Sequence, residues 1–203
     1  MENQVRGFDI SHWQGVFDFA KAESQGYKFA YVKATEGVSF KDKQFKRNWK
    51  EAPKNQIYVG AYHFYRPGLD PIDQAEHFLD TVGELAPGHL PHALDLEVVD
   101  GVRNSHILEG ALKWLELVHE KSQRLPIIYT GPSYVKERGG MAEFSVYPLW
   151  LAHYTALTPK VPKAWGTYSI WQYSSANGLD KNLFNGSLDK LRQFAGLSLC
   201  SEL

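Results

Sequence analysis

The chain has 203 residues and a mass of 23.1 kDa, a size that suits one domain. Hydrophobic residues make up 43% of it and charged residues 22%, a composition that excludes wholesale disorder. The net charge of −1 leaves no basic field to attract nucleic acid or an anionic membrane, so we expect neither as a partner.

The two ends of the sequence and its apolar runs bear on location. Residues 1–7 contain no apolar run behind a basic start, so no Sec signal is expected. Cys200 is the single cysteine, which excludes an intrachain disulfide and indicates an inert tail thiol. No apolar run approaches the ~20 residues of a membrane-spanning helix. We expect a soluble protein that begins in the cytoplasm and forms a single domain over residues 1–203.

Short β-branched or aromatic runs alternate with helical patterns through the first two thirds of the chain. The predicted strands there are Val5–Ile10, Phe29–Lys33, Ile57–Phe64, His92–Glu97 and Pro126–Thr130. The predicted helices are Phe17–Gln25, Lys41–Ala52, Pro71–Leu85, Ser105–Gln123 and Pro132–Arg138. Asp70 is a suitable N-cap for the third helix, which Pro71 then begins. The fourth helix has a predicted buried stripe of Ile107, Ala111, Trp114 and Val118.

The last third contains strand patterns with no helical pattern between them. These strands are Leu149–His153, Tyr168–Tyr173 and Leu179–Phe184. Pro159 and Pro162 indicate a loop over 154–166, and a short helix at Leu188–Phe194 closes the chain. Five βα units and three strands give eight strands, the number that closes a small barrel. We therefore predict an α/β fold, a variant TIM-like (β/α)5(β)3 barrel with incomplete outer helices; an open doubly wound sheet is the alternative.

Acidic residues occur where predicted strands end, which is where a β/α barrel gathers its chemistry. They are Asp9, Glu36, the pair Asp95 and Glu97, and Asp180. Asp95 and Glu97 are two residues apart on a strand and therefore share a face. Two close carboxylates repel, so one keeps its proton to higher pH, as the general acid for an acetal C–O bond must.

Structural readings of the same acidic residues remain open. Asp95 and Glu97 could be a helix cap and a salt-bridge partner. Asp9 lies in an Asp-x-Ser pattern that is also common in turns, and Glu36 suits a loop or capping role. Asp180 taken alone favours neither reading.

The sequence lacks the motifs of several other chemistries. It has no Gly-x-Ser-x-Gly elbow, no His-Glu-x-x-His or Cys-x-x-Cys pair, and no Gly-x-Gly-x-x-Gly or Walker loop. We therefore expect no metal and no cofactor. His63 is expected to be a satisfied near-core histidine.

Aromatic residues account for 14% of the chain and flank the same strand ends. Each one alone suits a protein core, but together they suit a carbohydrate groove in which flat rings cover pyranose faces. Tyrosine hydroxyls and Gln172 would supply hydrogen bonds there. The flanking aromatic residues are Trp13, Tyr62, Phe64, Tyr65, Tyr129, Trp150, Tyr154, Trp171 and Tyr173.

Eight segments follow one another in chain order, one at each predicted strand end. They are Asp9–Gly15, Phe29–Gly37, Gly60–Phe64, Leu94–Glu97, Ile127–Thr130, Leu149–Tyr154, Trp171–Ser174 and Gly178–Asn182. With these motifs the chain from about Phe8 to Phe184 resembles the family 25 glycoside hydrolases, lysozymes of the Chalaropsis type found in bacteria, fungi and phages.

The resemblance implies an eight-stranded barrel and cleavage of the β-1,4 bond between N-acetylmuramic acid and N-acetylglucosamine in peptidoglycan. It places the catalytic acid on Glu97, its partner on Asp95, and further cleft carboxylates on Asp9 and Asp180. We expect the substrate to bind against Tyr62, Phe64, Tyr129, Trp150, Gln172, Trp13 and Glu36.

Our mechanistic hypothesis is that Glu97 protonates the leaving oxygen while the 2-acetamido group of the substrate attacks the anomeric carbon, with retention. Asp95 would orient that group, and Asp9 and Asp180 would raise the pKa of Glu97. In a rival version one of these aspartates is a direct nucleophile, or the base for an inverting water.

The sequence also lacks the secretion signal, wall-binding repeats and cysteine pair of many relatives. Delivery to the cell wall through phage lysis or a specialised secretion system is therefore expected, with an immunity or inhibitor protein as a possible partner of a monomer. Two other functions stay open: a chitinase-like N-acetylhexosamine hydrolase, and a catalytically silent peptidoglycan-binding module.

Overall fold

The computed structural model describes residues 4–154 and 157–198, so Cys200 and the first three residues lie outside the described part of the chain. The strands are β1 (Val5–Ile10), β2 (Phe29–Glu36), β3 (Phe40–Lys41), β4 (Tyr58–Phe64), β5 (Ala93–Asp95), β6 (Ile127–Thr130), β7 (Leu149–Ala152), β8 (Ile170–Ser174) and β9 (Asp180–Phe184). The α-helices are α1 (Phe19–Ser24), α2 (Phe45–Lys54), α3 (Pro71–Val82), α4 (Asn104–Ser122), α5 (Pro132–Glu137) and α6 (Leu188–Phe194). Short 3₁₀ turns are η1 (His12–Gln14), η2 (Ala142–Phe144) and η3 (Ala176–Gly178).

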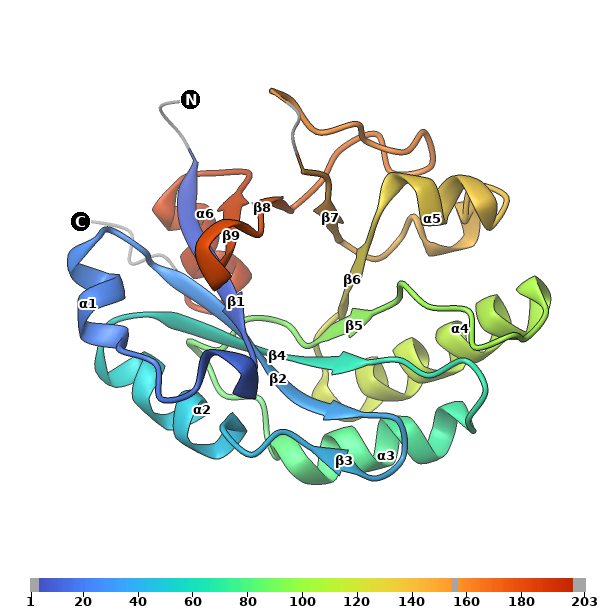
Figure 1. Cartoon of the computed structure of the whole chain (residues 1–203), viewed down its shortest axis with the longest axis horizontal. Coiled ribbons are helices and arrows are strands. Elements are labelled where there is room, and N and C mark those ends of the chain that lie inside the picture. The colour runs from blue at the N-terminus through green and yellow to red at the C-terminus, as the bar shows by residue number, and fades with distance from the viewer. Residues whose placement is uncertain (1–3, 155–156, 199–203) are drawn as a thin grey trace.

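Eight of the strands close into a barrel. Their order is β1-β9-β8-β7-β6-β5-β4-β2, and pairing of β1 with β2 completes the circle (Figure 1). Each of β1, β2, β4, β5 and β6 is followed by an α-helix, whereas β7, β8 and β9 follow one another without one. The predicted (β/α)5(β)3 barrel is therefore confirmed, and the open doubly wound sheet is wrong.

Strand β9 runs antiparallel to both of its neighbours, which the sequence analysis did not anticipate. The connection from β8 to β9 is only the short segment around η3, and a parallel neighbour would need a long crossover. The start of β9 therefore lies at the same barrel end as the ends of the parallel strands. Asp180 reaches that end from the beginning of a strand, so its predicted place at a strand exit is wrong.

Two further differences concern element boundaries. The segment at Phe40–Lys41 forms a hairpin with the end of β2, so α2 begins at Phe45 rather than at Lys41. The strand predicted over His92–Glu97 is only three residues long, which places Glu97 just beyond it. Helix α3 begins as predicted, because the side chain of Asp70 accepts hydrogen bonds from two backbone N–H groups of its first turn.

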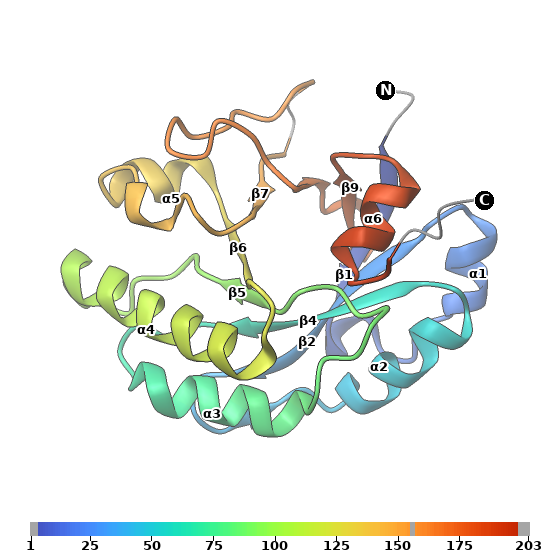
Figure 2. The same ribbon diagram turned by 180° about the vertical axis from the view of Figure 1, so that it is seen from behind.

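Helices cover the outer face of one half of the barrel. Helices α2, α3 and α4 lie along the side formed by β2, β4 and β5 (Figure 2). The predicted stripe of α4 is fully buried there: Ile107, Ala111, Trp114 and Val118. A second apolar cluster fills the barrel interior, where the ring of Tyr31 packs on Trp150. Gly60 makes room for that ring, because an added Cβ would lie 2.4 Å from it. No helix in the described ranges is both long and apolar enough to span a membrane.

Candidate active site

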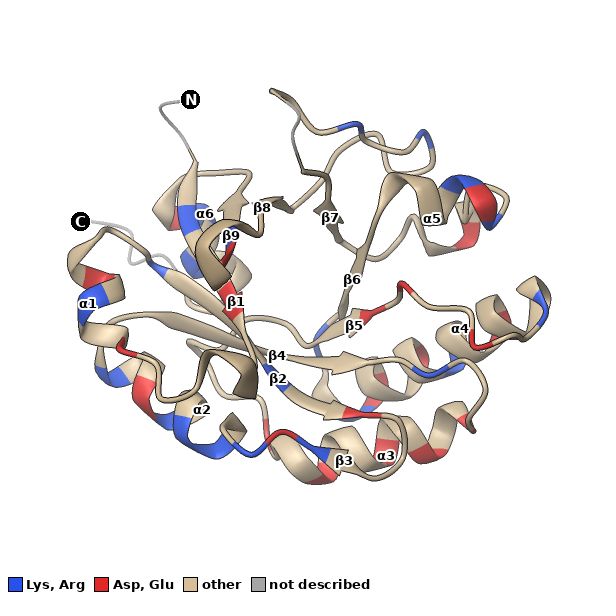
Figure 3. Cartoon of the chain, in the orientation of Figure 1, with Lys and Arg blue, Asp and Glu red and all other residues tan. Residues whose placement is uncertain are grey.

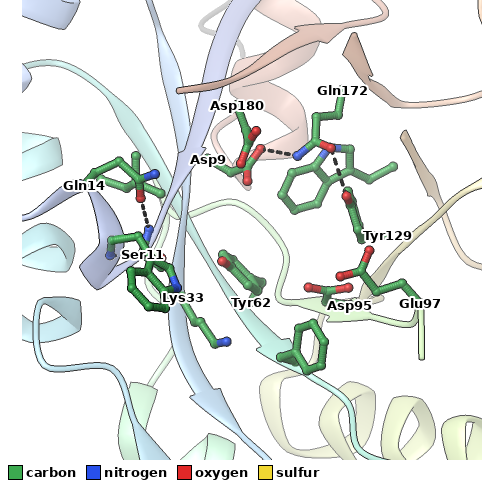
Figure 4. A pocket seen from close by; sticks show the side chains of 14 residues that line it. Asp9, Ser11, Gln14, Lys33, Tyr62, Asp95, Glu97, Tyr129, Gln172 and Asp180 are labelled. Atoms are coloured by element: carbon green, nitrogen blue, oxygen red, sulfur yellow. Dashed lines mark hydrogen bonds between the residues drawn. The ribbon is translucent and has the colours of Figure 1, made fainter. Parts of the chain in front are cut away.

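A pocket of about 220 Å³ opens at the barrel end where the parallel strands finish. All four predicted catalytic acids line it, and Figure 4 shows them facing the same space. Asp9 comes from β1, Asp95 from the end of β5, Glu97 from the following loop and Asp180 from the start of β9. In Figure 3 the acidic segments of β1 and β9 lie beside each other, and a further acidic segment lies at the end of β5. The barrel thus collects in one pocket carboxyl groups that are up to 171 residues apart in the chain, between Asp9 and Asp180.

Asp9 is buried at the wall of the pocket and held by two amides. Its Oδ2 atom accepts one hydrogen bond from Gln172 Nε2 and one from Asn182 Nδ2, both of 2.7 Å. Asp180 is its direct partner in the β1–β9 ladder. Burial, followed by the negative charge of Asp180, raises the pKa of Asp9 to about 8, against the opposing effect of the two hydrogen bonds.

Asp95 and Glu97 form the opposite acidic wall. Both line the pocket, while Leu94 and Leu96 are fully buried, in agreement with the predicted alternation. Asp95 Oδ1 is buried and has no hydrogen-bond partner among the described residues. Burial and then the charge of Glu97 raise the pKa of Asp95 well above its ordinary value.

Glu97 lies at the exposed rim of the pocket rather than at its floor. Loss of hydration is the largest cause that raises its pKa, and the carboxylate of Asp180 adds to it. The ammonium group of Lys33 acts in the opposite direction. Glu97 therefore combines access to a ligand with a proton that it keeps to higher pH than a free glutamate.

Aromatic side chains fix the amides that hold Asp9. Tyr129 donates a 2.9 Å hydrogen bond to Gln172 Oε1, and the hydroxyl of Tyr154 contacts the same oxygen. Trp150 Nε1 donates a 2.7 Å hydrogen bond to Asn182 Oδ1. Because each amide oxygen is occupied, each amide N–H₂ group must face Asp9. Asn182 escaped the sequence analysis, although it lies two residues after Asp180 and so on the same face of β9.

The predicted binding residues fall into two groups. Those that line the pocket are Trp13, Tyr62, Phe64, Tyr129, Trp150 and Gln172. Glu36 does not line it and lies in an adjoining groove, where it pairs with Lys33 at 2.7 Å and with Arg66. In that position Glu36 has a structural role between two cations, and its predicted contact with substrate stays a prediction for the groove rather than for the pocket.

Several flanking aromatic residues point elsewhere. Tyr65 is buried against Gly110 in the layer between sheet and helices. Trp171 donates to the carbonyl of His153 at 2.8 Å and packs on Tyr173, and neither ring lines the pocket. These side chains point outward because neighbours along a strand alternate between its faces, so Gln172 takes the inner position.

The histidine predicted to lie near the core does so. His63 is fully buried, within hydrogen-bond distance of Thr35 Oγ1 and Gln74 Oε1, and burial lowers its pKa to about 3. Across the described part of the chain, no three His, Cys, Asp or Glu side chains are grouped as metal ligands would be.

Lys33 is a pocket residue that the sequence analysis missed. Its Nζ lies over the ring of Phe64, 4.7 Å from the centroid, and its side chain is only 11% exposed. The signal for it was a lysine inside an otherwise apolar strand, where an unpaired cation is costly.

The pocket continues into the adjoining groove, whose volume is about 450 Å³, and Trp13 and Lys33 line both. Trp13 is 82% exposed, and Phe40 and Leu69 add exposed apolar surface along the groove. The backbone under Trp13 is fixed, because His12 bonds Asp42 at 2.7 Å and Gln14 donates to the carbonyl of Gly178 at 3.1 Å.

Comparison with known proteins agrees with this geometry. Residues 8–181 match the model of the glycosyl hydrolases family 25. The chain is 34% identical to lysozyme M1 of Streptomyces globisporus, with 94% of this chain and 71% of that one covered. It is 33% identical to the N,O-diacetylmuramidase of Chalaropsis sp, with 94% and 99% covered. A family GH25 lysozyme from Aspergillus fumigatus superposes with a TM-score of 0.90 at 32% identity, with 95% and 99% covered. The chain belongs to the glycosyl hydrolases family 25.

Proposed function

We propose that the protein is a lysozyme, an N-acetylmuramidase that hydrolyses the β-1,4 bond between N-acetylmuramic acid and N-acetylglucosamine in bacterial peptidoglycan. The observation that carries the proposal is the set of four carboxyl groups in one pocket, every one with a raised pKa. Relatives named lysozyme and N,O-diacetylmuramidase, each more than 30% identical over most of the chain, support the same substrate.

Glu97 is the proposed general acid. It is the most exposed of the four acids and can approach the glycosidic oxygen of a strand lying in the groove. Its raised pKa keeps it protonated where a free glutamate would be ionised. Glu97 gives its proton to the leaving oxygen as the C–O bond breaks.

Asp95 is the proposed partner of the substrate's own 2-acetamido group. Its buried Oδ1 has no hydrogen-bond partner among the described residues and is free to accept from the acetamido N–H. That hydrogen bond would aim the acetamido oxygen at the anomeric carbon, where its attack displaces the leaving sugar and forms an oxazolinium ion whose N–H still donates to Asp95. Water, deprotonated by Glu97 carboxylate, then opens the ring and leaves the configuration retained.

Asp180 is proposed to act through its charge rather than by bonding to the substrate, and Asp9, whose pKa is about 8, adds its own charge only as the pH rises toward that value. They form the wall opposite Asp95, and Asp180 raises the pKa of Glu97. Negative potential on that side also stabilises positive charge at the anomeric carbon in the transition state. We expect the enzyme to act as a monomer at the cell wall, because every group in this scheme comes from one chain.

The test is a comparison of Glu97→Gln with wild type on purified peptidoglycan. Glutamine keeps the shape of the side chain but carries no acidic proton, so kcat should fall by about 10²–10⁴ with an unchanged melting temperature. An NMR spectrum of the first products should show the β-anomer. Full activity of Glu97→Gln would exclude Glu97 as the general acid. An α-anomer as the first product would exclude participation of the acetamido group.

A further inference from the structure

A second groove, of about 550 Å³, lies between α5 and the loop that joins β7 to β8. We call it the basic groove, defined by Lys136, Lys160, Lys163, Val135, Val161 and Pro162. Figure 3 shows basic segments on both α5 and this loop. The mechanism proposed above uses none of these residues.

The charge of the basic groove is of one sign. In the part of the chain that the structure describes, no Asp or Glu lines it, and its three lysines are exposed and form no ion pair. By contrast, Lys33 and Arg66 near the barrel mouth are both paired with Glu36. Three unpaired cations around a concave surface with valine and proline walls suit an anionic ligand that also carries small apolar groups.

The basic groove is close to the catalytic pocket. Tyr129 and Trp150 line the pocket and are paired in the β6–β7 ladder. Pro132 and His153, each three residues further along the chain, line the groove. Three residues span at most about 10 Å, so the groove begins within about that distance of the pocket wall. Lys160 is held there, because its backbone N–H donates a 3.0 Å hydrogen bond to His153 Nδ1.

We propose that the basic groove binds the stem peptide attached to the lactyl group of the muramic acid next to the cleaved bond. This inference rests on the proposed function. The stem carries carboxylates and alanine methyl groups, which match the lysines and the apolar walls. A stem of five residues extends roughly 17 Å, which is longer than the distance from pocket to groove. The enzyme thereby favours glycan strands whose stems are still attached.

The kinetic test uses uncrosslinked glycan strands free of other wall polymers, with their stems and after an amidase has removed them. The variant combines Lys136→Gln, Lys160→Gln and Lys163→Gln. Its kcat/KM should fall about tenfold on stem-bearing strands and stay unchanged on stripped strands. The matched control removes the same charge from exposed lysines of α2 and α4 with Lys46→Gln, Lys50→Gln and Lys113→Gln, and should behave as wild type on both.

Three kinetic results would overturn the inference. The first is an equal loss of kcat/KM on both substrates in the triple lysine variant. The second is an equal loss of kcat/KM in the control variant. The third is a wild-type enzyme that prefers stripped strands or that shows no preference between the two substrates. A loss confined to walls that retain phosphodiester polymers would assign the groove to those polymers and would also overturn it.

A binding measurement separates this inference from the proposed function. Free stem pentapeptide titrated into Glu97→Gln protein should shift the NMR signals of Val135 and Val161, and the triple lysine variant should abolish those shifts. Peptide binding without glycan cleavage by wild type would defeat the proposed function and leave the peptide site standing. No binding would defeat the peptide site, whatever the activity.

Discussion

Removing the charge of Lys33 should move the alkaline limb of the activity profile to higher pH. As the proposed general acid, Glu97 must be protonated in the free enzyme, so kcat/KM is expected to fall as pH rises through its pKa. The ammonium of Lys33 lowers that pKa and the carboxylate of Asp180 raises it. Lys33→Met should therefore shift the limb upward, and Asp180→Asn should shift it downward.

The size of the shift follows from the dimensions of the pocket. A volume of 220 Å³ corresponds to a sphere roughly 8 Å across, which sets the scale of charge separation across the pocket. At an effective dielectric constant of about 40, suited to a group at the solvent-exposed rim, two unit charges at that distance interact by about 1 kcal/mol. That energy is equivalent to a little under one pKa unit, so each of the two substitutions should move the alkaline limb by roughly 0.5–1 pH unit.

The assay is kcat/KM on solubilised glycan strands from about pH 4 to pH 9. Lys28→Met is the matched control, since Lys28 pairs with Glu23 and lies outside the catalytic pocket. The midpoint of the alkaline limb should be the same in Lys28→Met as in wild type. If Lys33→Met left the limb in place, or moved it in the same direction as Asp180→Asn, Glu97 would not be the group that sets it.

Three further predictions concern binding and stability. Trp13→Ala should raise KM about tenfold, with kcat and melting temperature unchanged, because the indole is 82% exposed on a fixed backbone; an unaltered KM would remove it from the substrate path. Trp114→Ala should lower the free energy of unfolding in urea by about 3–5 kcal/mol, since the fully buried ring packs on His63 and Phe78; a loss below about 1 kcal/mol would contradict that packing. Asp9→Asn should be more stable than wild type at pH 9, by about 4–6 kcal/mol, and show little advantage at pH 4. The sign follows because the folded-state pKa of about 8 exceeds the unfolded value, so wild type loses stability as pH rises between the two, and equal urea midpoints at both pH values would refute it.

The sequence was sufficient for the barrel and for most strand positions, because each βα unit carries its own periodicity and caps. The direction of β9 could not be predicted from the sequence, because the alternation of side chains along a strand is the same whether the strand runs parallel or antiparallel to its neighbours. Only the shortness of the segment around η3 signals a hairpin. For this reason Asp180 was wrongly predicted to lie at the end of a strand rather than at its beginning. The residue lines the pocket all the same.

The positions of site residues were predictable where the chain keeps the alternation of a strand, and less so where a long side chain pairs with a residue distant in sequence. Asp95 and Glu97 share a wall as their spacing indicates. Glu36 and Lys33 lie close in sequence, yet their places in the site differ from those the sequence suggested: Lys33 reaches the pocket and Glu36 turns to Arg66. Arg66 comes from the loop after β4, so this pairing depends on a tertiary neighbour that local spacing does not contain.

The proposed cleavage is tested most directly by the new reducing end that the enzyme creates. Purified, unmodified peptidoglycan would be digested, reduced with borohydride and analysed by mass spectrometry. The account predicts fragments that end in muramitol with wild type and none with Glu97→Gln. Fragments that end in glucosaminitol would contradict it, because the substrate would then lie shifted by one sugar. Wild-type protein that pellets with the sacculi and releases nothing would contradict catalysis altogether.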